Sequence, residues 1–161
     1  MRRSAPLRFG SVRARLPHGE PGQRIGLLGG SFNPPHAAHV RLSEVALRRL
    51  QLDWVWWLVT PGNPLKPTFE LKPLAQRLAL SRRLATNPRI RISALETGLA
   101  TPFTTATVAH LRLRRPDLRF VWLMGADNLA QLHRWRQWRR LVESVPFAVI
   151  DRPGWRLRAI S

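Results

Sequence analysis

The sequence contains no cysteine, few acidic residues and no long apolar run. Without cysteine, the chain can form neither a disulfide nor a thiolate metal site, and nothing in it argues for an oxidising compartment. The longest apolar stretches, such as Trp54 to Val59 and Phe147 to Ile150, are far shorter than the roughly 20 residues that span a bilayer. We therefore expect a soluble, cytoplasmic protein with no membrane-spanning segment.

Basic residues outnumber acidic residues by 27 to 9, which gives a formal net charge of +18, and Lys66 and Lys72 are the only lysines. Arginine pairs bidentately with phosphate, so such a chain favours polyanionic partners, either nucleotides or nucleic acid. An arginine bias that reflects genome composition, with most arginines on solvated faces, explains the same numbers. Charge alone therefore does not identify the partner.

The start of the chain differs in composition from the rest. Met1 to Arg24 contain six arginines, three prolines and three glycines with few apolar residues, a composition that cannot bury enough surface to offset the entropy of ordering. We interpret residues 1–24 as a basic, disordered tail. An arginine-rich, acid-poor start also fits a transit peptide, although no amphipathic period stands out. At 161 residues and 44% hydrophobic, the chain has enough apolar material for one domain, over residues 25–161.

After the tail, short apolar runs alternate with longer segments of helical period, which is typical of parallel strands joined by crossover helices. The expected strands are Ile25–Leu28, Trp54–Thr60, Arg89–Leu95, Arg119–Met124 and Pro146–Ile150, and the expected helices are Ala37–Leu50, Pro73–Ala85, Thr104–Arg114 and Trp135–Val142. This order predicts an α/β fold, a Rossmann-like, doubly wound open parallel sheet of about five strands with helices on both faces. Ligands of such sheets bind outside the carboxyl ends of the strands, so segments that follow strands are the candidate sites.

The segment after the first expected strand is the strongest candidate. Gly29 and Gly30 permit backbone angles and a close approach that a side chain would block. His36 and His39 lie three residues apart at a helix start, so they share one face at its positive end, where anionic oxygens gather. Each piece also has an ordinary explanation, because a glycine pair makes a turn and two histidines can be a surface coincidence or half a metal site.

Taken together, GGSFNPPHAAH from Gly29 to His39 resembles the GGSFDPxHxGH motif of the HxGH nucleotidyltransferase superfamily. Asn33 stands where the motif has aspartate and Ala38 where it has glycine, and the extra methyl of Ala38 is expected to crowd the nucleotide. The resemblance implies that His36 and His39 are catalytic, that a substrate phosphate attacks the α-phosphorus of a nucleoside triphosphate, and that Mg²⁺ neutralises the departing pyrophosphate. The ATP-binding residues that it implies here are Gly29, Gly30, Ser31, Phe32, His36 and His39.

Three further motifs, each after an expected strand, resemble those of the bacterial nicotinate-nucleotide adenylyltransferases. Thr60 to Lys66 resembles their TPxxNPxK motif, Thr101 to Val108 their YTxDTL segment, and Met124 to Asn128 their GxD segment. The resemblance implies that Gly125 and Asp127 complete the ATP site. The residues that it implies for the mononucleotide are Asn63, Lys66, Thr104 and Trp135, with Trp135 stacked on the pyridine ring.

Alone, these three segments are explained by ordinary structure. They correspond to a common loop, a capped helix start and a turn with a capping aspartate. Trp135 forms a core stripe of helical period with Trp138 and Leu141. In the YTxDTL-like segment, Phe103 replaces the tyrosine and Ala106 replaces the aspartate, so one polar contact is unaccounted for.

Members of this family continue past a segment like Val149 to Gly154 to an IS-x-T-x-IR motif, which clamps the triphosphate and the nucleobase region. The chain ends at Ser161, and we interpret Ala159-Ile160-Ser161 as only coincidentally like that motif, so we expect a C-terminally incomplete nucleotidyltransferase domain.

The predicted function is transfer of AMP from ATP to nicotinate mononucleotide, which makes deamido-NAD and pyrophosphate in NAD biosynthesis. ATP with its Mg²⁺ and nicotinate mononucleotide are the expected partners, and neither nucleic acid nor a membrane is expected. Two alternatives stay open: nicotinamide mononucleotide as the acceptor, and a truncated form that binds nucleotide or RNA with impaired catalysis.

Overall fold

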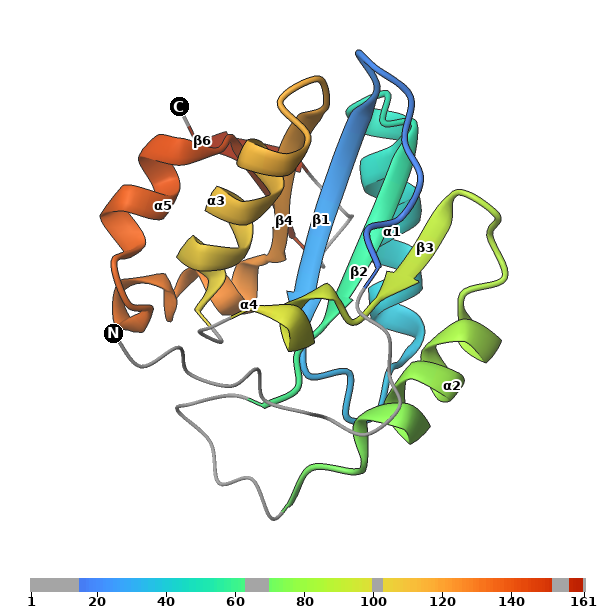
Figure 1. Ribbon diagram of the computed structural model, residues 1–161. Coiled ribbons are helices and arrows are strands. Elements are labelled where there is room, and N and C mark those ends of the chain that lie inside the picture. The colour runs from blue at the N-terminus through green and yellow to red at the C-terminus, as the bar shows by residue number, and fades with distance from the viewer. Residues whose placement is uncertain (1–14, 63–69, 100–102, 152–156, 161) are drawn as a thin grey trace, which may run out of the picture.

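The computed structural model describes residues 15–62, 70–99, 103–151 and 157–160 (Figure 1). Within these residues the strands are β1 (Arg24–Gly30), β2 (Trp54–Val59), β3 (Ile90–Ser93), β4 (Arg119–Gly125), β5 (Phe147–Ile150) and β6 (Leu157–Ile160). The helices are α1 (Ala37–Arg49), α2 (Leu74–Leu84), α3 (Thr104–Arg114), α4 (Ala126–Leu129) and α5 (Trp138–Ser144), and short 3-10 turns form η2 (Leu95–Gly98) and η3 (Leu132–Arg134).

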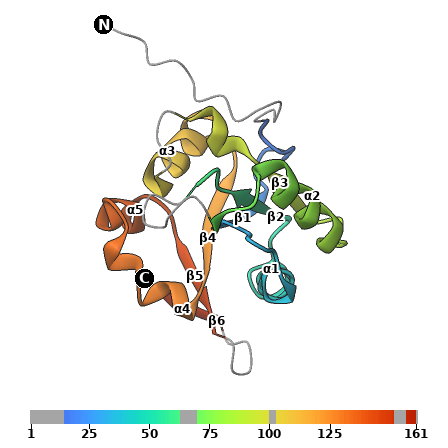
Figure 2. The same cartoon turned by 90° about the horizontal axis from the view of Figure 1, so that it is seen from below.

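The strands form one sheet in the order β3-β2-β1-β4-β5-β6. Strands β1 to β5 are parallel to one another, with β1 between β2 and β4. Helices α1 and α2 lie on one side of the sheet, and α3 and α5 lie on the other (Figures 1 and 2). The predicted doubly wound parallel sheet is therefore confirmed, and the carboxyl ends of β1, β2 and β4 meet at the edge that faces downward in Figure 1.

The structure differs from the prediction at β6, at the start of the last helix, and in the short α4, η2 and η3, which the sequence did not predict. β6, which the sequence did not predict, runs antiparallel to β5, with Phe147 opposite Ile160 and Ile150 opposite Leu157. A four-residue edge strand takes its stability from the neighbour with which it pairs, so its own residues give little signal. The last helix starts at Trp138 instead of Trp135, because Gln137, with φ of 56°, is in the left-handed region.

Residues 15–23, which we expected to belong to the tail, contact the domain. The Gly22 N–H donates to the Asp117 carbonyl at 2.8 Å, and Trp54 Nε1 donates to Gln23 Oε1 at 3.0 Å. Arg115 forms a two-pronged ion pair with Asp117 and also donates to the Gly19 carbonyl at 2.6 Å. The partners lie far along the chain, so composition alone could not show that this segment is part of the domain.

Each face of the sheet carries its own apolar core. Trp56 and Trp57 are adjacent in β2 and both have 0% exposure, yet Trp57 belongs to the core beneath α1 and α2, and Trp56 to the core beneath α3 and α5. This follows from the alternation of side chains along a strand that is buried on both faces. No helix in the described part of the chain is long and apolar enough to cross a membrane.

We expect Gly26→Ala to destabilise the fold. A Cβ at Gly26, in the central strand, would lie 2.7 Å from both Leu52 Cδ1 and Leu123 Cδ1, whereas a Cβ at Gly30 would lie an ordinary 3.5 Å from the Phe32 ring. Overpacking should lower the free energy of unfolding of the Gly26 variant by about 1–3 kcal/mol. Urea denaturation checks this, with Gly30→Ala as the matched control, and equal losses in the two variants would contradict it.

Candidate functional site

The described site residues lie at the carboxyl edge of the sheet. Gly29 and Gly30 end β1, Gly125 ends β4, and Asp127 lies exposed in α4 directly after β4. A Cβ at Gly125 would lie 4.0 Å from Leu42 Cδ1 of α1, so the end of β4 adjoins the helix that carries the two histidines. The structure therefore brings together segments that are about a hundred residues apart in sequence.

His36 and His39 form a pair at the start of α1. His36 is the N-cap residue, and its backbone N–H donates to Nδ1 of His39 at 3.1 Å. The centroids of the two rings are 4.0 Å apart. Because Nδ1 of His39 accepts a hydrogen bond, the neutral ring carries its proton on Nε2, which makes Nε2 a donor.

Two aromatic rings, those of Phe32 and Trp57, pack against His39. Phe32, which is 1% exposed and has φ of 48°, contacts both His39 and Trp57, with ring centroids at 4.5 Å and 5.0 Å, and the His39 and Trp57 centroids are 5.8 Å apart. Trp57 Nε1 donates to Ser43 Oγ at 2.8 Å, and Ser43 Oγ donates to the His39 carbonyl at 2.8 Å. The Phe32 side chain therefore supports the histidine. Because it is buried, only the main chain of Phe32 can contact a nucleotide.

The two glycines at the end of β1 differ in whether the surrounding atoms leave room for a side chain. A Cβ at Gly29 would lie 2.7 Å from the Trp122 ring, so packing against Trp122 requires glycine there. At Gly30 the nearest atom is 3.5 Å away, and packing does not require glycine. Gly30 is thus the position whose missing side chain the core does not explain.

Arg77 joins the loops of the site from inside the protein. It is 1% exposed, and its Nη1 donates to the carbonyls of Ser31 and Thr60, both at 2.7 Å. Its Nη2 donates to the Pro61 carbonyl at 3.2 Å, and its Nε to the Lys72 carbonyl at 2.8 Å. Burial lowers the pKa of Arg77, and none of the ion pairs between described residues involves it.

Sequence reasoning missed Arg77, because an arginine in a helix of a strongly basic chain predicts a solvated face. Its position on α2 gives one weak signal. Arg77 lies between the buried Leu74 and Leu78 at helical spacing, so it shares their face.

Asn33 ties the same loop to the segment before α2. Its Nδ2 donates to the Glu70 carbonyl at 2.9 Å, and its Oδ1 accepts from the Lys72 N–H at 3.1 Å. An ionised aspartate could accept the second bond but could not donate the first. Asparagine therefore suits the pairing at this position. Asn63 and Lys66, which we predicted for the mononucleotide, lie outside the described residues.

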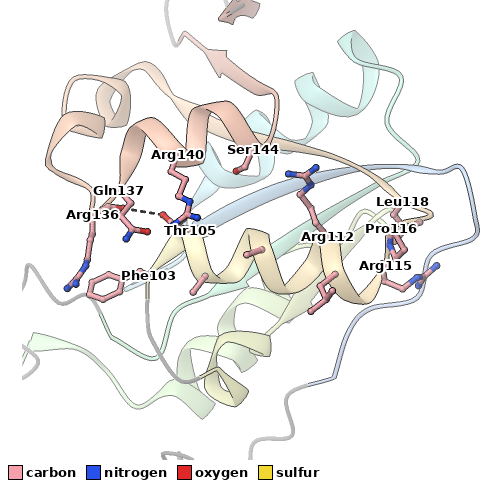
Figure 3. Close-up of a pocket in the computed structure, with 13 residues that line it drawn as sticks. Phe103, Thr105, Arg112, Arg115, Pro116, Leu118, Arg136, Gln137, Arg140 and Ser144 are labelled. Carbon is pink, nitrogen blue, oxygen red and sulfur yellow. Dashed lines mark hydrogen bonds between the residues drawn. The ribbon is translucent and has the colours of Figure 1, made fainter.

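The predicted mononucleotide residues Thr104 and Trp135 lie on adjoining segments. Thr104 is the first residue of α3, and Trp135, half-buried after η3, meets Trp122 edge-to-face at 6.3 Å. Thr105 Oγ1 donates to the Arg136 carbonyl at 3.2 Å, which joins the residue after Thr104 to the residue after Trp135 (Figure 3).

A groove of about 1000 Å³ runs between α3 and α5 beside these segments (Figure 3). Phe103 lies at one end, with the Arg136 guanidinium 5.0 Å from its ring centroid. Arg112 and Arg140 also line the groove, and neither takes part in an ion pair with a described residue. Basic side chains therefore line the groove along α3, from Arg136 near its start to Arg112 near its end.

Glu96, in η2, is a second buried ionisable residue that sequence reasoning did not find. It is 6% exposed, its Oε1 accepts from Thr107 Oγ1 of α3 at 3.0 Å, and its Oε2 has no hydrogen-bond partner among the described residues. Burial raises the pKa of Glu96 to about 7, although hydrogen bonds with the Thr107 and Thr60 hydroxyls lower it. A short turn with one acidic residue gives no sequence signal that its carboxyl is buried.

Comparison with known proteins gives one consistent result. Residues 27–160 match the family described as cytidylyltransferase-like. The chain is 54% identical over 146 residues to a nicotinate-nucleotide adenylyltransferase of Mesorhizobium japonicum, covering 91% of this chain and 75% of that protein. It is 59% identical over 138 residues to the protein of the same name from Bradyrhizobium sp. (strain ORS 278), covering 86% of this chain and 72% of that protein.

Among solved structures, the chain resembles the Plasmodium falciparum nicotinic acid mononucleotide adenylyltransferase complexed with NaAD. The TM-score is 0.73 at 18% identity, over 84% of this chain and 68% of that one. At this identity the likeness concerns the fold, and it agrees with the open sheet and its two helix layers.

We expect Arg77→Met to lower the free energy of unfolding by about 3–5 kcal/mol, because several buried carbonyls lose a charged donor at once. Arg82→Met on the same helix, where the side chain is exposed, should change it by less than about 0.5 kcal/mol. Urea denaturation measures both. A loss in the Arg77 variant as small as that of the Arg82 control would show that the four hydrogen bonds do not hold the loops.

Glu96 should make stability depend on pH. Below its ordinary pKa of 4.5 the carboxyl is neutral in both states; between 4.5 and about 7 only the unfolded chain ionises, so stability is lost as pH rises through this range. Between pH 5.5 and 7.5 the wild type should lose about 2 kcal/mol relative to Glu96→Gln, which has no titrating group there. Urea denaturation at the two pH values tests this, and parallel curves for the two proteins would contradict it.

Proposed function

We propose the reaction of this site from one premise: the chain belongs to the cytidylyltransferase-like family and, within it, to the nicotinate-nucleotide adenylyltransferases. It is a nucleotidyltransferase that transfers the adenylyl group of ATP to nicotinate mononucleotide, giving deamido-NAD and pyrophosphate in NAD biosynthesis. The observation that carries the proposal is the pair of imidazoles, 4.0 Å apart, at the start of α1 and next to the glycine-rich end of β1.

In this reaction an oxygen of the mononucleotide phosphate attacks the α-phosphorus of ATP in line. The bond from that phosphorus to the oxygen shared with the β-phosphorus breaks, and pyrophosphate leaves with the electron pair. No bond to the protein forms, so the chain contributes position and charge stabilisation.

His36 and His39 donate imidazole N–H groups to the phosphate oxygens on which charge grows. The first backbone N–H groups of α1 point to the same place, where the positive end of the helix favours anions. The hydrogen bond from the His36 N–H to Nδ1 directs the proton of His39 to Nε2. The stack on Phe32 and Trp57 then fixes the ring before the substrate arrives.

On the ATP side, Gly30 and Ser31 offer main chain close to the phosphates, since packing does not require glycine at position 30. Gly125 lets the nucleotide approach the end of β4, and the exposed Asp127 carboxylate accepts a hydrogen bond from the ribose. Gly29 has a different task, because its missing side chain makes room for Trp122.

Mg²⁺ enters with ATP as part of the substrate. Its preferred ligands are oxygens, which the triphosphate supplies. Among the described residues, no three histidine, aspartate or glutamate side chains gather into a metal site of their own. When bound, the ion neutralises charge on the departing pyrophosphate.

On the mononucleotide side, the start of α3 and the Trp135 segment bind the nicotinate group. Thr104 and the N-terminal backbone of α3 suit a carboxylate, and Trp135 stacks on the pyridine ring. The Thr105 to Arg136 hydrogen bond keeps these two segments together. Asn63 and Lys66 complete this subsite in the proposal, on the strength of the sequence resemblance alone.

Pyrophosphate release tests the proposed function. With ATP, Mg²⁺ and nicotinate mononucleotide, the wild type should release pyrophosphate, and His39→Asn should lower kcat/KM at least about tenfold, because one charge-assisted hydrogen bond supplies roughly 1.5–3 kcal/mol. His18→Asn, at an exposed histidine paired with Glu20, is the matched control and should leave kcat/KM unchanged.

The substrate assignment is tested by changing the acceptor of the adenylyl group or the nucleoside triphosphate. Turnover with nicotinamide mononucleotide or pantetheine phosphate, or with cytidine triphosphate in place of ATP, and none with nicotinate mononucleotide, would overturn the substrate assignment. Equal loss of activity in both histidine variants would overturn the role of His39.

A further inference from the structure

The first turn of α3 is connected to the sheet by one buried carboxyl group. Glu96, just after β3, accepts a hydrogen bond from Thr107 of α3 at 3.0 Å, and Thr107 is itself fully buried. The Thr60 hydroxyl, at the end of β2, also lowers the pKa of this carboxyl and donates to the Gly62 carbonyl at 2.9 Å. Glu96 therefore connects the segment after β3 to α3 through one hydrogen bond, and the Thr60 hydroxyl after β2 also acts on its carboxyl.

Stability alone does not explain this arrangement. Burial of a carboxyl is costly, and Glu96 Oε2 has no partner among the described residues. Two apolar side chains of similar volume in place of Glu96 and Thr107 would fill the same space without that cost. A group that the fold retains at a loss is a candidate for a role in the site.

The position of the hydrogen bond indicates what that role is. Thr107 lies one helical turn after Thr104, so the two side chains share a face of α3. On the other side of the same turn, Thr105 donates to the Arg136 carbonyl (Figure 3). The inner bond to Glu96 sets the depth of the helix start against the sheet, and the outer bond links it to the Trp135 segment.

We propose that Glu96 is a positioning residue for the mononucleotide: through Thr107 it holds the N-terminal turn of α3 at the place where the nicotinate group binds. The inference rests on the proposed function. Glu96 and Thr107 contact neither histidine and neither of the glycine-rich strand ends among the interactions of the described residues. The hydrogen bond of Glu96 to Thr107 leads to α3, so the ATP side of the site should depend on these two residues much less than the mononucleotide side does.

Comparing KM for nicotinate mononucleotide with KM for ATP distinguishes a positioning role of Glu96 from a general effect on stability. In Thr107→Val and Glu96→Met, which keep volume but lose the hydrogen bond, KM for nicotinate mononucleotide should rise at least about tenfold, since small displacements of a binding group are costly. KM for ATP should stay within about twofold. Glu96→Gln keeps an acceptor for Thr107 and should restore KM for the mononucleotide to within about threefold of wild type.

Thr86→Val is the matched control, because it removes the hydroxyl of a threonine that is exposed in the loop before β3. It should change neither KM. The double variant Glu96→Met/Thr107→Val should be no worse than either single variant, because both remove the same bond. An equal rise of KM for both substrates, or a full additive loss in the double variant, would overturn the proposal.

Hydrogen exchange of the ligand-free chain keeps this test separate from that of the proposed function. The peptide that covers the start of α3 should exchange at least about tenfold faster in Thr107→Val than in wild type or in Thr86→Val. Absence of turnover by the wild type would count against the proposed function. Unchanged exchange in Thr107→Val would count against the positioning role, whether or not the wild type turns over.

Discussion

The loops that carry the site are joined by one buried cation. The loops that follow parallel strands gather at one edge of the sheet, and their carbonyl groups there have no further strand to pair with. The Arg77 guanidinium is planar and has five N–H donors, so it can reach the carbonyls after β1, after β2 and before α2 at the same time. The positions of Ser31 and Thr60 depend on this group.

The two helix layers on either side of the sheet position different parts of the candidate site. The layer of α1 and α2 holds the histidine pair, through the Phe32 stack and through the Trp57 to Ser43 hydrogen bond. The layer of α3 and α5 holds the segments proposed for the mononucleotide. β1 lies between the layers, and its glycines admit Leu52, Leu123 and Trp122 so closely that both layers pack against one strand. The candidate residues of both substrates therefore flank the carboxyl end of β1.

The elements that could be predicted from the sequence are those whose signal is local. The buried run of β2 and the period of α3 each show their structure within a few residues, and both were confirmed within one residue at either end. β6, the contacts of residues 15–23 and the late start of α5 were missed, because each depends on a distant partner or on one unusual backbone angle.

The same distinction applies to the site. Glycines and histidines after β1 form a compact motif, and the structure brings His36 and His39 into contact. Arg77 and Glu96 belong to no motif of that kind. Their importance comes from burial, and a basic residue in a helix or an acidic residue in a turn is most often solvated. Only the coordinates show that these two charged groups lie inside the protein.

The hydrogen bonds of Thr105 and Thr107 also restrain the rotation of α3 about its own axis. Thr105 and Thr107 are two residues apart, and successive residues of a helix are about 100° apart around its axis, so the two side chains point in nearly opposite directions. One is bonded to Arg136 and the other to Glu96. A roll of the helix about its long axis would move the two hydroxyls sideways in opposite directions and would strain both bonds at once. The two hydroxyl bonds therefore add to the buried side chains of Val108 and Leu111 in fixing the rotation of α3, and with it the direction in which Thr104 points.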